Sequence, residues 1–180
     1  MKWNAIFILL AASVFAAFAA NTFAPSAAGQ TRKVDDRALP QQLSETEVQS
    51  ILKETNPKSH VEASLKISDM RIASAMKSIQ ANQYLAAVQD VDVFAGLIIY
   101  ADDYTRKLPE AQNKDRNACL KKIEQTIFKH TRDLEFIARE VPYETREPVE
   151  DKINQVKKIR LRAINDLLGG GKTIHTSEER

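Results

Sequence analysis

The sequence predicts an all-α fold, a mostly antiparallel bundle of four long helices preceded by a short one. Apolar residues recur every three or four positions along most of the chain, which is the spacing of amphipathic helices. No segment sustains an alternation of apolar and polar residues, and the Asn-Gly and Asp-Gly pairs that turn β-hairpins are absent from the sequence. The chain has only 5 glycines, which also disfavours a β-rich fold.

The first 28 residues have the features of a signal peptide. One lysine near the start is followed by an apolar run over residues 5–20 and then by small residues, which fits cleavage before Ala20 or before Gly29. The alternative is an uncleaved membrane anchor, but a spanning helix needs about 20 apolar residues and this run stops at Asn21. We therefore expect a secreted or periplasmic protein.

The chain after this leader is long enough for one domain with a proper core. We expect a flexible lead-in over residues 29–43, a helical bundle over residues 44–171 and a disordered tail over residues 172–180. No segment of the mature chain is expected to span a membrane. Of the 26 basic residues only Lys2 lies in the leader, so the mature chain has a net charge of +1 against 24 acidic residues. This balance gives the whole chain no electrostatic field that would attract nucleic acid or anionic lipid, and we expect no nucleic-acid partner.

A capping box and a proline set the limits of the first two helices. Ser44 and Glu47 can each cap the backbone amide of the other, so a short helix is expected to begin there. It ends before Pro57, because a residue that precedes proline is pushed out of the α region. Pro57 then opens a longer helix. The apolar stripe of that helix loses its phase near residues 81–83, where we expect a turn or a kink.

The third helix is expected over residues 84–108, and a wide apolar band indicates that it is covered on more than one side. Gly96 lies inside it, where glycine is less favourable than alanine by about 1 kcal/mol. The close approach of a neighbouring backbone would explain this glycine. Beyond Pro142, Pro148 is expected to start the last helix, and the glycines at 169–171 are expected to end it. The residues expected to face inward on this helix are Val149, Ile153, Val156, Ala163 and Leu167.

The clearest amphipathic stripe lies between Pro109 and Pro142. Its members alternate steps of three and four: Leu120, Ile123, Ile127, His130, Leu134, Ile137 and Val141. We expect the aliphatic members to be among the most buried residues. His130 shares the stripe, so its ring is expected inside the bundle, with a hydrogen-bond partner from a tyrosine of a neighbouring helix or from the stripe of Arg160.

Three motifs for chemistry can be excluded. Residues 169–173 end like a phosphate-binding loop, but Asp166 stands where that loop needs its first glycine. No histidine follows a glutamate by three residues, as di-iron bundles require. Cys119 is the only cysteine, which excludes an intrachain disulfide and c-type haem attachment. It is interpreted as a small buried apolar residue, with an intermolecular disulfide as the alternative in an oxidising compartment.

Most charges are expected on solvated helix faces. Acidic residues often precede a basic residue by four positions, as Asp102 precedes Arg106, and such pairs stabilise exposed helices. One basic cluster lies on the last helix and is also interpreted as a solvated face, with a contact to phosphate, to an acidic partner or to a membrane surface as the alternatives. Its members are Lys157, Lys158, Arg160 and Arg162. Arg160 is the exception, because it shares the inward stripe and is a candidate to pair with a buried carboxylate.

These observations predict a non-enzymatic exported domain that acts by binding a protein or an envelope component. No catalytic residue, metal ligand or cofactor is assigned, and nothing in the pattern supports a homodimer. The alternatives are a bundle that binds a small ligand or cofactor in its interior, and an enzyme with acid and base residues assembled across helices. The ligand-binding candidates are His130, Tyr100, Tyr104 and Arg160. Their convergence in one pocket would favour these alternatives.

Overall fold

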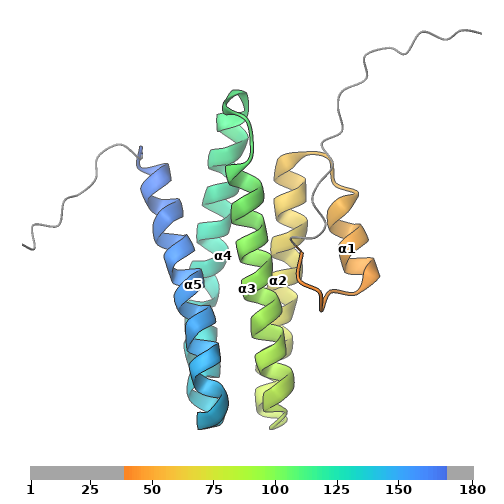
Figure 1. The fold of residues 1–180 in the computed structure, drawn as a ribbon, viewed down its shortest axis with the longest axis vertical. Coiled ribbons are helices and arrows are strands. Elements are labelled where there is room, and N and C mark those ends of the chain that lie inside the picture. The colour runs from red at the N-terminus through yellow and green to blue at the C-terminus, as the bar shows by residue number, and fades with distance from the viewer. Residues whose placement is uncertain (1–38, 170–180) are drawn as a thin grey trace, which may run out of the picture. The chain divides into compact units, whose positions relative to one another are not determined.

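The computed structural model describes residues 39–169, whose fold is shown in Figure 1. Four long helices lie side by side, and a short helix, α1 (Glu45–Leu52), lies beside them. The long helices are α2 (Pro57–Gln80), α3 (Tyr84–Arg106), α4 (Asn113–Glu140) and α5 (Tyr143–Leu167), and the short 3-10 helix η2 (Glu110–Gln112) precedes α4. Short loops make successive long helices antiparallel, and no strand occurs between residues 39 and 169. The predicted all-α bundle is confirmed.

The predicted leader and most of the lead-in and tail lie outside the described residues. The last five residues of the expected lead-in, 39–43, are described and pack against the bundle. Leu39 is buried, and a Cβ added at Gly96 would lie 2.7 Å from Pro40 Cγ. Gly96 is therefore explained by close approach, as predicted, but the approaching group is a proline ring and not a backbone.

The start of α1 and the turn before α3 follow the predicted local rules. The Glu47 amide donates to Ser44 Oγ at 3.3 Å, and the Ser44 amide donates to Glu47 Oε2 at 2.8 Å, which confirms the capping box. Asn56 caps α2, with Pro57 as its first helical residue. Asn82 takes a left-handed conformation, with φ at 59°, in the tight turn between α2 and α3.

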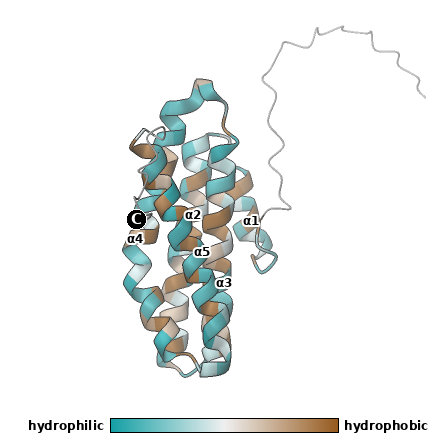
Figure 2. Cartoon of the chain, turned by 60° about the vertical axis from the view of Figure 1, so that its left-hand side comes forward, coloured by the Kyte–Doolittle hydropathy of each residue, from teal (hydrophilic) through white to brown (hydrophobic). Residues whose placement is uncertain are grey.

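The interior consists of two apolar clusters. The larger lies among the four long helices, and the smaller lies between α1, residues 39–43 and one side of α2 and α3. α3 contributes to both clusters, which confirms that it is covered on more than one side. In Figure 2, hydrophobic and hydrophilic residues alternate along the helices, as expected when each helix has one buried and one solvated side.

The apolar band of α3 gives this helix the length and composition of a membrane span. By length and composition α3 is the one helix between residues 39 and 169 that could cross a membrane. However, 56% of the relevant window is buried inside the bundle. Its apolar character is thus accounted for by its contacts with both clusters.

The predicted start of the last helix was wrong. α5 begins at Tyr143, with Pro142 at its N-cap, and Pro148 lies inside the helix. A proline there removes only one backbone hydrogen bond, in the second turn. A second observation favours a helix that begins before Pro148. The guanidinium of Arg146, in the first turn of α5, donates to the carbonyls of Ala138 at 3.1 Å and of Arg139 at 3.2 Å. The first turn of α5 thereby satisfies carbonyls that the end of α4 leaves open.

The stripe predicted for α4 faces the core. Its aliphatic members are at most 2% exposed: Leu120, Ile123, Ile127, Leu134, Ile137 and Val141. The inward stripe of α5 is also buried, except that Leu167, expected inward, is 36% exposed at the helix end. Gly169 has a φ of +93°, the left-handed conformation of a helix C-terminus, which agrees with the predicted cap.

Candidate functional site

The structure distributes the four ligand-binding candidates over three places. His130 lies between α2 and α4, the two tyrosines of α3 lie beside His60 of α2, and Arg160 lies where α5 meets α4. His60 and Asp69, the α2 residues of the first two places, are nine positions apart, which corresponds to about 14 Å along a helix. The candidates therefore do not converge in one site.

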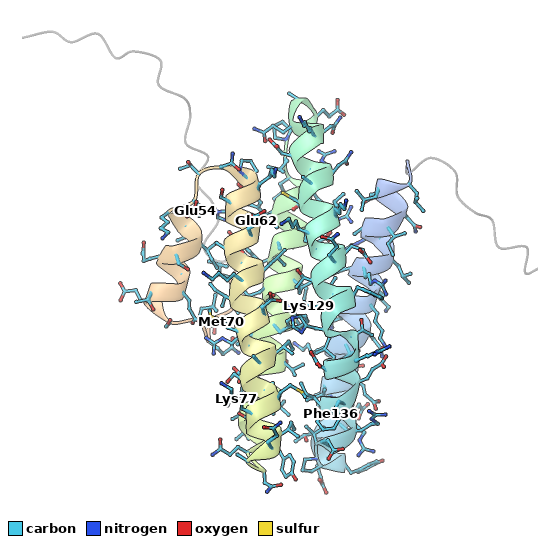
Figure 3. All side chains as sticks on the ribbon, turned by 180° about the vertical axis from the view of Figure 1, so that it is seen from behind. Glu54, Glu62, Met70, Lys77, Lys129 and Phe136 are labelled. Atoms are coloured by element: carbon cyan, nitrogen blue, oxygen red, sulfur yellow. The ribbon has the colours of Figure 1, made fainter. Side chains whose placement is uncertain are left out.

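The ring of His130 is held by two carboxylates. Its side chain is 8% exposed, Nε2 lies 2.7 Å from Asp69 Oδ1, and Nδ1 lies 3.1 Å from Asp133 Oδ2. Lys129, labelled in Figure 3 where α4 faces α2, donates to the second oxygen of Asp69 at 3.0 Å. The edge of the ring also meets Phe94 of α3, with the two centroids 5.9 Å apart.

This arrangement suits a clamp between helices. A neutral imidazole has one N–H, so only the doubly protonated ring donates to both carboxylates. The hydrogen bond to Asp69 joins α4 to α2. Our expectation of a tyrosine or the stripe of Arg160 as the partner of His130 was wrong, because both partners are aspartates. Within residues 39–169, no three His, Cys, Asp or Glu side chains are arranged to hold a metal ion.

Tyr100 and Tyr104 surround a second, fully buried histidine. His60 Nε2 lies 2.6 Å from the hydroxyl of Tyr100, and Nδ1 lies 3.1 Å from the carbonyl of Glu54. The ring also stacks on Tyr104, with centroids 4.3 Å apart. Since a carbonyl only accepts, Nδ1 carries the proton and Nε2 accepts from Tyr100. A neutral imidazole satisfies both contacts, so this cluster connects α3 to the segment that links α1 and α2.

Acidification is expected to destabilise the bundle through His60. Burial lowers the pKa of His60 below its ordinary value of about 6.5. The unfolded chain then binds more protons than the folded one, so the free energy of unfolding falls as the pH drops below about 6.5, down to the folded-state pKa. Urea titrations on both sides of this value measure the effect, and the loss should be smaller in His60→Gln than in the wild type.

A second measurement needs no variant. In the folded wild type, the ring protons of His60 should show the neutral imidazole in NMR spectra at a pH where a histidine in an unfolded peptide is half protonated. A pH dependence of stability that is identical in His60→Gln, together with an ordinary titration of the His60 ring, would contradict the prediction.

Three of the four cations in the predicted basic cluster of α5 are bound to carboxylates. The pairs are Lys157–Glu135, Arg160–Glu124 and Arg162–Asp102, with N–O distances of 2.9, 2.9 and 2.5 Å. Arg160 thus meets a carboxylate, as predicted, but the side chain of Glu124 is 21% exposed and is only partly buried. The Arg160 guanidinium also lies 4.6 Å from the centroid of the Phe128 ring, a cation–π contact.

Asp102 was expected to form a solvated pair with Arg106, and this expectation of a solvated position was wrong for Asp102. Its side chain is fully buried, and its Oδ2 accepts from Arg106 Nε at 3.0 Å and from Arg162 Nη2 at 2.5 Å. Arg106 also binds Asp166 of α5 at 2.7 Å. The i,i+4 partner was correctly predicted, but α5 covers the pair and adds a second cation. This network joins α3 to α5.

Cys119 is a buried thiol that is poorly suited to reaction. Its Sγ lies 3.8 Å from the carbonyl of Pro57, and burial raises the pKa of the thiol to about 11. Since the thiolate is the reactive form, a buried thiol with this pKa is inert at neutral pH. The prediction of a small buried residue is confirmed.

Apolar side chains gather on the shared outer surface of α4 and α5. Phe128 and Leu161 are each 63% exposed, and Leu168 is 80% exposed. Leu161, Ile164 and Leu168 are three and four positions apart, so they share one side of α5. The contact between Arg160 and Phe128 places the phenyl ring beside that helix. We refer to Phe128, Leu161, Ile164 and Leu168 as the α4–α5 face.

The sequence contained a signal for the α4–α5 face that our interpretation missed. Leu161, Ile164 and Leu168 form an apolar series with the spacing of a helix side, but they lie outside the predicted inward stripe, which runs from Val149 to Leu167. A second apolar side on a helix is covered either by another element of the same chain, as in α3, or by a partner, and in α5 it is exposed.

Comparisons with known proteins give no match. No family model, curated protein or solved structure matches this chain. Its function is therefore argued from the residues described above.

Proposed function

We propose that the chain is an exported, non-enzymatic helical domain that binds a protein or another component of the cell envelope. The observation that carries this proposal is the α4–α5 face, where an aromatic ring and two leucines are at least 63% exposed. Single exposed apolar residues are common on soluble proteins, but grouped ones mark interaction surfaces. The export signal predicted from the sequence supports a partner outside the cytoplasm.

The positions of the four ligand-binding candidates favour binding at the surface over an interior ligand. The ring nitrogens of His130 face two aspartates, Tyr100 and Tyr104 surround His60, and Arg160 is paired with Glu124. These contacts fasten neighbouring helices to one another. An interior ligand would have to break them before it gained its own.

A photo-crosslinking amino acid in place of Leu161 tests the proposal in cells that export the protein. We expect a discrete adduct with a protein or a lipid, because Leu161 lies in the α4–α5 face. The matched control is Leu85, which is 68% exposed near the start of α3 and lies outside that face. Absence of an adduct at Leu161, or the same adducts at both positions, would refute the proposal.

A variant of His130 separates structure from function. His130→Gln should lower the melting temperature, because it weakens the clamp between α2 and α4, and should leave the Leu161 adduct unchanged. Unchanged stability together with loss of the adduct or of an associated activity would make His130 part of the site, and would favour the enzymatic or ligand-binding alternative.

A further inference from the structure

Two lysines near the α4–α5 face have no acidic partner among the described residues. Lys121 stands seven positions before Phe128 on α4, and Lys158 stands three positions before Leu161 on α5, so each shares a side with the apolar residue. Both lysines are exposed, and neither forms an ion pair with any residue from 39 to 169.

Two acidic residues beside the face are already neutralised, and the nearest acidic residue along α5 without an ion pair within residues 39–169, Asp151, stands seven positions before Lys158, about 10 Å along the helix. Glu124 binds Arg160 and Glu135 binds Lys157, each across the contact between α4 and α5. The two unpaired lysines therefore give this surface a local positive charge, although the whole mature chain is nearly neutral. At physiological ionic strength a charge is felt over about 8 Å, so the local charge decides what approaches.

The exposure of the apolar residues distinguishes between two kinds of partner. Leu168 is 80% exposed, and Phe128 and Leu161 are 63% exposed, so these side chains protrude from the helices. A protein partner would need a matching pocket for each protruding side chain. A lipid surface needs none, since it accepts apolar side chains at the boundary between headgroups and acyl chains and attracts nearby lysines with its phosphates.

We propose that the α4–α5 face docks on an anionic phospholipid surface, with Phe128, Leu161 and Leu168 at the acyl boundary and Lys121 and Lys158 against headgroup phosphates. This inference rests on the proposed binding function and names its partner.

Vesicle sedimentation of the exported protein tests the inference. The protein should sediment with phosphatidylcholine vesicles that contain one-third phosphatidylglycerol, much less with pure phosphatidylcholine, and less again at high salt. Lys121→Gln should weaken binding to the anionic vesicles roughly fivefold, the effect of one lysine near a charged surface. Leu161→Gln should weaken it about tenfold or more, since one buried leucine is lost.

Two substitutions outside the face serve as matched controls. Lys77→Gln removes an exposed lysine of α2, labelled in Figure 3, and Leu85→Gln removes an exposed leucine of α3. Both should leave vesicle binding unchanged, and unaltered thermal melts confirm that all four variants fold. Failure to bind anionic vesicles, or equal losses in Lys77→Gln and Lys121→Gln, would overturn the inference.

The two proposals can fail separately. If the vesicles do not bind while the Leu161 adduct contains a protein, the partner is a protein and only the lipid inference falls. If neither vesicles nor adducts are found, both proposals fall together.

Discussion

Replacing Asp102 by alanine is expected to lower the free energy of unfolding by about 1.5–3 kcal/mol, the range for a lost hydrogen bond to a charged group. The Asp102 side chain is fully buried and accepts hydrogen bonds from Arg106 and Arg162. Without it, Arg162 loses its only ion-pair partner among the described residues, and Arg106 keeps only Asp166. The variant therefore removes both charge-assisted hydrogen bonds of this carboxylate, while water still reaches the side chains of Arg106 and Arg162, which are 33% and 55% exposed.

Urea titration with a fluorescence or circular-dichroism readout measures this loss. Asp103→Ala is the matched control, because Asp103 is the next residue on α3 and is exposed. It should change the free energy of unfolding by no more than about 0.5 kcal/mol. Asp102→Asn keeps the shape and loses the charge, so its effect should fall between the two. A loss below about 1 kcal/mol in Asp102→Ala would show that the network contributes little.

The atoms left unpaired in this network belong to the same pair. Asp102 Oδ1 and Arg106 Nη2 are buried and have no hydrogen-bond partner among the described residues. Nε and Nη2 form one edge of a guanidinium, and Nε of Arg106 already donates to Asp102. A small approach of the two groups would complete a two-point contact, the strongest arrangement for arginine and carboxylate.

Helix limits were predictable from the sequence where they depend on local chemistry. The capping box at Ser44, the proline that opens α2 and the turn at residues 81–83 each involve residues close together in the chain. The start of α5 was not predictable in the same way. It depends on contacts of Arg146 with carbonyls of the preceding helix, and these exist only once the two helices are packed.

The partners of charged residues were less predictable, because they come from other helices. Glu62 binds Lys122 of α4, although Lys66 stands four positions after it. His130 likewise finds Asp69, which is 61 positions away. Rules for spacing within one helix describe only the neighbours on that helix. Which side chains meet across helices depends on helix order and rotation.

The α4–α5 face was also not predictable from spacing rules within one helix. Spacing alone reveals that Leu161, Ile164 and Leu168 share a side of α5, but not whether another helix covers that side. Coverage follows from the positions of α3 and α4, which leave this side open. The exposed face thus became visible only in the folded structure.

Ile127→Ala is expected to lower the free energy of unfolding by roughly 2–5 kcal/mol, the range for truncating a large aliphatic residue in a core. Ile127 is 1% exposed and belongs to the apolar cluster that all four long helices share. Residues on several helices surround the deleted atoms, so a cavity remains where the side chain was. Ile127→Val removes a single methylene and should cost only about 0.5–1.5 kcal/mol.

The control for this series is Leu85→Ala, which removes a similar volume from a residue that is 68% exposed. It should change stability by no more than about 0.5 kcal/mol. Urea titrations of the three variants and the wild type provide the comparison. The expected order of losses is Ile127→Ala, then Ile127→Val, then Leu85→Ala. If Ile127→Ala cost less than about 0.5 kcal/mol, the stripe of α4 would not face the core, and the packing described here would be wrong.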